Sequence, residues 1–318
     1  MAKYLRLPFF DELEKAKNIL LVGAGGGYDI FSGLPLYFGL RAEGKSVHLA
    51  NLSFSFLPPL KGQKGSPPLL KVTADTPLFS DYFPERFLSE WFRQQGEDIF
   101  IYCFNSSGVK TLSKIYKALI NHLSIDTIIL VDGGTDSLMR GDEVGLGTPY
   151  EDIANIIAVN ELNVERKILT CLGFGVDYFH GICHAQFLEA VADLTKSDGY
   201  LGLFSLMPEM PEVQKFRAAS EYVFKAMPND ISIVSSSILS ALSGHYGNYH
   251  ATTRTRGSQL WINPLMPVYW CFQISQVAQR ILYLEQMKET MTKMDVRRVI
   301  QKFRLQCQTI RAWENIPI

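Results

Sequence analysis

The sequence predicts a doubly wound α/β fold, with a mostly parallel, Rossmann-like sheet, helices on both faces and a helical C-terminus. Short apolar runs alternate along the chain with segments whose apolar residues recur every three or four positions. Several runs are apolar on both faces, as strands buried in a parallel sheet are. No internal repeat or low-complexity linker interrupts the alternation. We therefore expect a single α/β domain over residues 1–318, with a helical segment at 273–312 packed on it.

Seven apolar runs are the expected strands: 18–23, 46–52, 98–104, 127–132, 167–174, 200–206 and 231–236. Helical spacing is found at 108–123, 150–162, 184–194 and 211–227. Near the C-terminus, an apolar stripe with steps of three or four predicts one helix over 274–294. Segment 55–72 is rich in Pro, Gly and Lys, which interrupt both helices and strands, so we expect a surface loop there or a lid over a site.

Composition favours a small-molecule ligand. The 318 residues carry 31 basic and 32 acidic side chains, for a formal net charge of −1, and like charges form no blocks. Neither a nucleic-acid groove nor a polybasic membrane surface is therefore expected. The N-terminal "MAKYLRLPFF" lacks the apolar core of a secretory signal, and prolines break the apolar stretch at 260–272. We expect a cytoplasmic protein with reduced cysteines, and a homo-oligomer remains open.

The stretch "LLVGAGGGYD" follows the first expected strand. Its four glycines are Gly23, Gly25, Gly26 and Gly27. Ligands of open α/β sheets bind beyond the carboxyl ends of the strands, and backbone N–H groups of a glycine-rich turn favour an anion there. The dinucleotide fingerprint is only partial because Tyr28 replaces its last glycine, and the Walker A lysine is missing. We expect the loop to hold the ligand, and Asp29 to bond a sugar hydroxyl.

Further strand ends carry polar residues as well. The second strand ends in Asn51, where an NAD-binding fold usually has an acid, and Ser106 follows the third strand. Both are candidate ligand contacts. Because the carboxyl ends of parallel strands meet at one edge of the sheet, we expect these loops to form one site with the loops after the fourth and fifth strands.

The stretch "DGGTDSLMRGDE" after the fourth strand is rich in carboxylates. Oxygen ligands of this kind suit Mg²⁺, so we expect a metal site built from Asp132, Asp136 and Asp142. Alternatively, Asp136 acts as a general base if burial raises its pKa. Arg140 is positioned to pair with a phosphate or carboxylate. In the structural alternative, Asp132 caps the strand end, Asp136 pairs with Arg140, and the other acids are solvated.

Gly133 and Gly134 in the same stretch complete the expected ligand contacts. The next strand is followed by "GVDYFHGICHAQF", in which Asp177 and His180 are candidates for proton transfer because imidazole titrates near neutrality. A metal site from His180 and His184, which are four residues apart, is the weaker alternative, and His184 is expected to be structural.

The segment 243–256, "SGHYGNYHATTRTR", follows the last expected strand and a short serine-rich helix. Its histidines, Asn248 and its two arginines suit closure over an anionic ligand, although a plain surface loop would have a similar composition.

The stretches "GAGGGYD", "DGGTDSLMRGDE", "GFGVDYFHG" and "HYGNYH" together resemble an uncharacterised family of bacterial and archaeal proteins known only as a domain of unknown function, over nearly the whole chain. The resemblance implies a single α/β domain. It implies no activity, substrate or catalytic residue.

From the residues themselves we expect an enzyme that binds a nucleotide or another phosphorylated small molecule, with hydrolysis or group transfer as its reaction. Asp132 and Asp136 would bind Mg²⁺ or a ribose, and Asp177 or His180 would transfer protons. One alternative is an NAD(P)-binding oxidoreductase or an NAD-consuming enzyme. Another is a non-catalytic nucleotide sensor whose Lys-rich loop at 61–71 and C-terminal helices transmit ligand occupancy to a partner.

Overall fold

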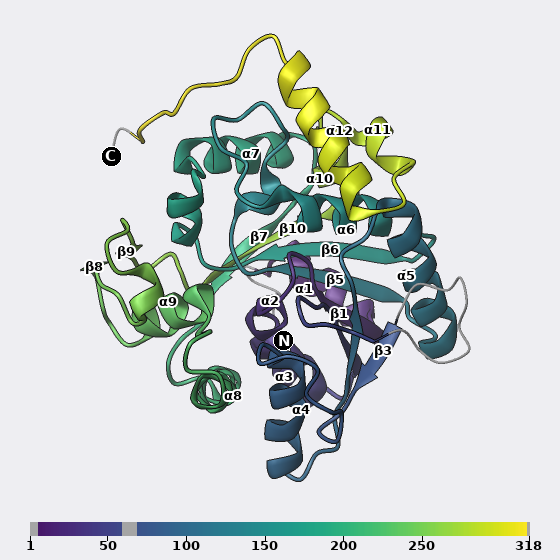
Figure 1. Cartoon of the computed structure of the whole chain (residues 1–318), viewed down its shortest axis with the longest axis vertical. Helices are drawn as coiled ribbons and strands as arrows, with labels where there is room; N and C mark the ends of the chain where they lie inside the picture. Colours follow the sequence, from purple (N-terminus) through teal and green to yellow (C-terminus); the bar gives the residue numbers. More distant parts are fainter. Residues whose placement is uncertain (1–5, 59–68, 317–318) are drawn as a thin grey trace.

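The computed structural model describes residues 6–58 and 69–316. Its centre is an eight-stranded sheet in the order β3-β4-β2-β1-β5-β6-β10-β7 (Figure 1). The strands are β1 (Asn18–Gly23), β2 (Ser46–Leu52), β3 (Leu69–Val72), β4 (Ile101–Phe104), β5 (Thr127–Asp132), β6 (Arg166–Cys171), β7 (Tyr200–Ser205) and β10 (Val268–Gln273). All neighbours from β4 to β6 are parallel, whereas β3 and β10 run antiparallel to their neighbours. The predicted α/β class with a mostly parallel sheet is confirmed.

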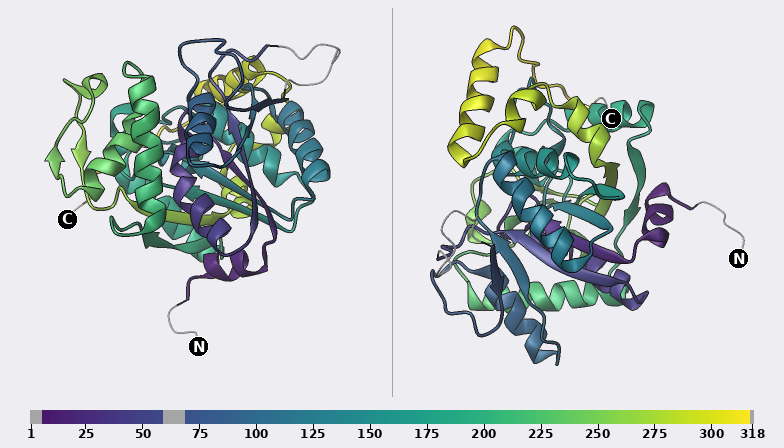
Figure 2. Two further views of the ribbon diagram at one scale, coloured as in Figure 1. Left: turned by 90° about the horizontal axis from the view of Figure 1, so that it is seen from below. Right: turned by 90° about the vertical axis from the view of Figure 1, so that its right-hand side faces the viewer.

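Helices cover both faces of the sheet (Figure 2). One face carries α1 (Pro8–Lys15), α2 (Asp29–Ser32), α3 (Leu34–Ala42), α4 (Pro84–Gln94), α8 (Pro211–Ala226) and α9 (Ile233–Leu242). The other carries α5 (Val109–Leu123), α6 (Pro149–Asn160), α7 (His184–Lys196), α10 (Ile274–Arg280), α11 (Leu284–Lys288) and α12 (Lys293–Gln306). Side chains alternate between the two faces of a strand. In β1, Ile19 and Leu21 therefore pack into one core cluster, and Leu20 and Val22 pack into the other.

The order in which strands are added to the sheet reverses between β1 and β5. From β1 the chain continues to β2 and β4 on one side, and it then returns to build β5 and β6 on the other side. The two adjacent carboxyl ends leave a crevice at such a switch point, where ligands of open α/β sheets bind. The glycine-rich stretch after β1 and the acidic stretch after β5 both begin there.

The segment 231–236, which we predicted to be a strand, is instead the start of α9. The side chain of Ser232 caps this helix by accepting a hydrogen bond from the Ser235 backbone N–H at 3.1 Å. Farther along, the Ser240 hydroxyl donates to the Ser236 carbonyl within the helix. The alternation of Ile and Ser imitated a strand over a few residues, but α9 buries apolar residues such as Ile238 at helical spacing.

The C-terminal stripe is not one helix. The chain leaves the helical conformation between α10 and α11 and again before α12, so the stripe is divided among three helices. All three contact α6, and Figure 1 shows them on the same side of the sheet. Strand β10, which precedes them, was not predicted; it is inserted between β6 and β7, so its apolar residues are buried on both faces.

The predicted loop at 55–72 contains β3 at its end, and this edge strand was also missed. Residues 59–68, on which the lid alternative and most of the Lys-rich loop depend, lie outside the described residues. Within the described ranges, no helix has the length and apolar character needed to cross a membrane. Each of the five cysteines is a free thiol, in agreement with the prediction.

Candidate functional site

A pocket of about 450 Å³ lies at the switch point of the sheet. Its walls come from the turns after β1 and β5, the start of α6, the short 3₁₀ helix η2 (Val176–His180), and the starts of α9 and α12. The acidic and basic side chains that line it are Asp29, Asp132, Asp136, Glu151, Asp152, Asp177, His180, Arg254, Lys293 and Arg297. We call it the acidic pocket.

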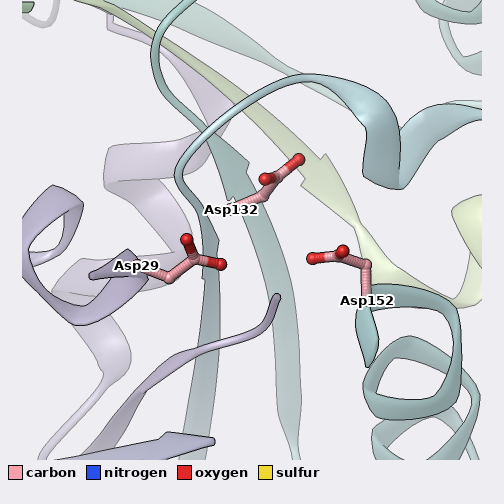
Figure 3. Close-up of side chains that lie close together, drawn as sticks. All are labelled: Asp29, Asp132 and Asp152. Atoms are coloured by element: carbon pink, nitrogen blue, oxygen red, sulfur yellow. The ribbon is translucent and has the colours of Figure 1, made fainter. Parts of the chain in front are cut away.

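Three carboxylates converge in this pocket. Asp29 begins α2, Asp132 ends β5, and Asp152 lies in the first turn of α6. Each offers an oxygen, and these atoms all lie within 4.8 Å of one another. Figure 3 shows Asp29 and Asp152 pointing toward each other from opposite sides, with Asp132 at the strand end between them. Oxygens at this spacing can surround a divalent cation.

The ionised carboxylates of this cluster repel one another when no cation is bound. Burial, together with the neighbouring carboxylates, raises the pKa of Asp29 to about 8 and holds the pKa of Asp132 and Asp152 well above the usual range. Oδ1 of Asp152 is buried and accepts no hydrogen bond from any described residue. A divalent cation would offset the repulsion and give this oxygen a partner.

The glycine loop shapes the carboxylate cluster. The Gly25 backbone N–H donates to Oδ2 of Asp29 at 2.6 Å, and the Gly27 N–H donates to the Leu52 carbonyl at 3.0 Å. These two amides are therefore engaged inside the protein. Gly26 and Gly27 have φ values of 98° and 61°, in the region that favours glycine, so the tight turn depends on them.

The side chain of Asn51 holds this turn in place by hydrogen bonds. Its buried side-chain NH₂ donates to the Gly27 carbonyl at 2.7 Å and to Oε1 of Glu85 at 2.8 Å. A Cβ on Gly23 would collide with the Asn51 side chain, so glycine is required there for packing. Neither Asn51 nor Gly23 lines the acidic pocket.

Asp136 and Asp177 fix the other wall of the pocket. Asp136 accepts hydrogen bonds from the Thr148 backbone N–H at 2.7 Å and from its hydroxyl at 3.1 Å. Oδ2 of Asp177 accepts from the Thr135 backbone N–H at 2.7 Å. Burial and the charge of Asp177 raise the pKa of Asp136 to about 7. Of the glycines after β5, Gly133 lines the pocket, whereas Gly134 packs against Asp177 so closely that a Cβ would overlap its carboxylate.

His180 and Asp177 form a pair at the pocket wall. Nδ1 of His180 lies 3.8 Å from Oδ1 of Asp177, and this interaction raises the pKa of His180 above its usual value. The side chain of His180 is 46% exposed, so it can exchange protons with a ligand or with solvent. His184 lines a different cavity, so the two histidines do not share a site.

Arg140, Asp142 and Ser106 do not line the pocket. Arg140 makes a forked contact with Asp142, with two nitrogen–oxygen distances of 2.9 Å, and Asp142 also binds Arg311 at 3.0 Å. The expected Mg²⁺ site from Asp132, Asp136 and Asp142 is therefore not assembled, because Asp142 is held in this ion-pair network. The Ser106 hydroxyl donates to Glu151 at 3.1 Å, so it contacts the pocket only indirectly.

Several pocket residues were not among the predicted site residues. Asp152 lies in the helix "PYEDIAN", where an acid in the first turn is ordinary because it complements the helix dipole. Lys293 and Arg297 are four residues apart on α12, and that spacing, which places both on one face, is the signal that could have identified them. Lys293 pairs with Glu151 at 2.5 Å, and the guanidinium of Arg297 lies over the Tyr150 ring.

Comparison with known proteins places the chain in a family without an assigned activity. Residues 87–307 match the model of a family described as a protein of unknown function (DUF1152), and the chain belongs to this family. No curated protein matches the chain. The match is shorter than the expected near-complete coverage: it includes Asp132, Asp152 and His180 but begins after the glycine-rich turn and Asp29.

Proposed function

We propose that this protein is a Mg²⁺-dependent enzyme that hydrolyses a phosphorylated small molecule, such as a nucleotide, or transfers a group from it. The observation that carries the proposal is the convergence of Asp29, Asp132 and Asp152, with oxygens within 4.8 Å of one another, at the switch point of the sheet. Mg²⁺ in enzyme sites is held by a few carboxylates, waters and the phosphates of the substrate. The unpartnered Oδ1 of Asp152 supports a cation at this point.

The phosphate would be bound by the cations of the same pocket. Arg254, Lys293 and Arg297 line it together with the three carboxylates. Nε of Arg297 is buried and donates to no described residue, so its guanidinium keeps hydrogen-bonding capacity for an oxyanion. A bound cation and these side chains would share the negative charge of a transferring phosphoryl group.

Proton transfer would fall to His180. Its pairing with Asp177 orients the imidazole, and its exposure on the pocket wall allows it to activate a water or protonate a leaving group. Asp136 is less suited to this role because its carboxylate already accepts two hydrogen bonds from Thr148.

An NAD-dependent reaction is the less favoured alternative. In dinucleotide-binding folds the pyrophosphate occupies the N–H groups of the glycine turn. Here the carboxylate of Asp29 engages the N–H of Gly25, and Asn51 is buried against Glu85 where a ribose-binding acid would be needed. A nucleotide sensor without catalysis remains the second alternative, since α12 in the C-terminal segment contributes Lys293 and Arg297 directly to the pocket.

Two measurements on one set of variants test the proposal. The first is titration of Mn²⁺, as a paramagnetic substitute for Mg²⁺, followed by electron paramagnetic resonance. The second is phosphate release from nucleoside mono-, di- and triphosphates with and without Mg²⁺. We expect one bound Mn²⁺ whose affinity falls at least about 10-fold in Asp152→Asn, because one charged ligand is lost. Asp81→Asn, at an exposed acid that does not line the pocket, is the matched control.

The outcomes separate the alternatives. Mg²⁺-dependent phosphate release that is lost in Asp152→Asn would support the proposal. Saturable nucleotide binding without turnover would favour the sensor. Equal Mn²⁺ affinity in the wild type and in Asp152→Asn would refute the metal site.

A further inference from the structure

A second cavity of about 810 Å³ lies on the other side of η2 from the acidic pocket. Tyr178 of this 3₁₀ helix lines the second cavity, whereas Asp177 and His180 line the acidic pocket. The remaining walls come from the turn after β6, the start of α7, the hairpin of β8 (Gly247–Asn248) and β9 (Trp261–Ile262), the segment 258–265 and Ile316. Its volume falls in the range of about 300–1,000 Å³ that is typical of small-molecule sites. We call it the aromatic cavity.

Two large aromatic side chains stand exposed at this cavity. Tyr246 is 69% exposed and Trp261 is 57% exposed, and their rings meet edge to face with centroids 5.6 Å apart. The neighbours of Trp261 in sequence, Leu260 and Ile262, are buried in the main core. The hairpin is therefore anchored by its inward side chains and presents Trp261 toward the cavity. Exposed rings of this size on an anchored element indicate a binding surface.

The cavity contains no formal charge among the described residues that line it: Asp, Glu, Lys and Arg are absent from the lining. His184 carries the one imidazole there, and burial lowers its pKa, which favours the neutral ring. This composition contrasts with that of the acidic pocket and disfavours an ionic ligand group.

A buried nitrogen at the cavity lacks a partner. The His184 ring packs between Phe174 and Tyr178, with centroid distances of 5.1 and 5.7 Å. Its Nε2 is buried and has no hydrogen bond to any described residue. An unpaired buried polar atom costs free energy, and a ligand atom that donates to or accepts from Nε2 would remove this cost.

Two other polar side chains of the lining, Asn263 and Ser258, are engaged within the protein. The side chain of Asn263 donates to the carbonyls of Phe174 and Trp261 and accepts from the Leu265 N–H. The Ser258 hydroxyl donates to the Thr255 carbonyl. An aliphatic chain would leave Nε2 of His184 unpaired.

We infer that the aromatic cavity binds an uncharged planar heteroaromatic ring of the nucleobase type, which packs against Trp261 and Tyr246 and hydrogen-bonds to Nε2 of His184. A ring of this kind combines flat apolar faces with a few in-plane donors and acceptors, which is what the lining offers. The inference concerns a separate cavity and does not depend on the metal site.

The test uses adenosine, which carries a heteroaromatic ring and no phosphate, in isothermal titration calorimetry with the full-length protein. We expect saturable one-to-one binding. Trp261→Ala should weaken it about 10-fold, the loss expected from removing one stacking ring. His184→Phe keeps an aromatic ring between Phe174 and Tyr178 but removes Nε2, and should weaken binding about 5-fold, the loss of one hydrogen bond. Phe56→Ala, at a 64% exposed ring that does not line the cavity, should have no effect.

The inference would be overturned by the absence of saturable adenosine binding to the folded wild type, by equal affinity in Trp261→Ala and wild type, or by tighter binding of octanoate or glucose than of adenosine. Asp152→Asn should bind adenosine with unchanged affinity. If Asp152→Asn lost adenosine binding while Trp261→Ala kept it, the ring would lie in the acidic pocket and the inference would be wrong. Because Trp261 is exposed, its replacement is expected to leave the fold intact, which thermal unfolding would verify.

Discussion

The carboxylate of Asp29 contacts the backbone four residues before it in sequence: its Oδ2 accepts a hydrogen bond from the N–H of Gly25 at 2.6 Å. A Cβ on residue 25 would lie 2.7 Å from this oxygen and 2.7 Å from Oδ1 of Asp152. Two carboxylates therefore approach the same backbone point, and only the absence of a side chain leaves room for both. The glycine-rich turn therefore lets two carboxylates converge at the carboxyl end of β1, in addition to any contact it makes with a ligand.

Gly25→Ala is predicted to displace Asp29 or Asp152 and to weaken Mn²⁺ binding at least about 10-fold, with a loss of about 1–3 kcal/mol in unfolding free energy from overpacking. Electron paramagnetic resonance and urea denaturation measure the two effects. Gly39→Ala is the control, since Gly39 lies within α3 and an added Cβ would meet only Glu212 Cγ at 3.8 Å. It should keep Mn²⁺ affinity and gain about 0.5–1 kcal/mol. Unchanged metal binding in Gly25→Ala would contradict the proposed role of the turn.

Asp152→Asn is predicted to raise the melting temperature of the metal-free protein. The substitution keeps the shape of the side chain but removes a carboxyl group whose pKa is held high by burial and by its acidic neighbours. Differential scanning calorimetry with a chelator at mildly alkaline pH would measure the change, because the unfavourable charge is most populated there. A lower melting temperature would show that Asp152 has a stabilising partner in the metal-free state.

The metal-free protein is predicted to lose stability as pH rises from about 4 to about 8. The folded-state pKa is raised to about 8 for Asp29 and to about 7 for Asp136, while an unfolded aspartate titrates near 4. The folded state therefore holds more protons in this window, and its unfolding free energy falls as they dissociate. Mg²⁺ binds the deprotonated carboxylates and should restore stability toward about pH 8. Urea denaturation at several pH values with chelator or Mg²⁺ provides the test; stability that rises with pH in chelator would contradict it.

His180 is predicted to titrate above the usual imidazole pKa because of its interaction with Asp177. In Asp177→Asn the pKa of His180 should fall, since the favourable charge is lost while the partial burial remains. Nuclear magnetic resonance of the histidine side chains across the pH range measures both values without requiring a substrate. His48, whose pKa is lowered by burial and by the charge of His122, supplies an internal reference that should remain unchanged. Identical His180 titrations in the two proteins would exclude the pairing.

Parallel topology explains which part of the acidic pocket could be predicted. Asp132 and Asp177 follow apolar strands, and once the sheet is recognised as parallel these strand ends must meet at one edge. Asp142 also follows β5, the strand that ends in Asp132, but it lies beyond η1 (Asp136–Leu138). Arg140 and Arg311 bind its carboxylate there, outside the pocket lining. A residue that closely follows a strand end in sequence can therefore lie outside the site. The sequence does not reveal the turn at η1 after which Asp142 leaves the pocket.

The rest of the pocket depends on tertiary packing that leaves no local pattern. Asp152 resembles any acid in the first turn of a helix. Lys293 and Arg297 approach the pocket because α12 packs on α6, and this packing depends on the breaks before α11 and α12 that the apolar stripe conceals. Strand β10 was not predicted for the same reason: its place between β6 and β7 is set by contacts with strands far away in the sequence.

Arg297→Gln is predicted to weaken the binding of inorganic phosphate and of adenosine monophosphate about 10-fold in the presence of Mg²⁺. The guanidinium of Arg297 lies over the Tyr150 ring at 5.2 Å and lines the acidic pocket with a buried Nε, so a phosphate there would gain a charge-assisted hydrogen bond. Arg298→Gln is the matched control, because the neighbouring Arg298 is 74% exposed and pairs only loosely with Asp295 at 3.8 Å. Calorimetric titration of both variants compares the loss of one pocket cation with the loss of one surface cation. If phosphate bound only through a general electrostatic attraction to the protein, the loss of either arginine would weaken binding equally. A phosphate site in the acidic pocket requires Arg298→Gln to bind phosphate like the wild type.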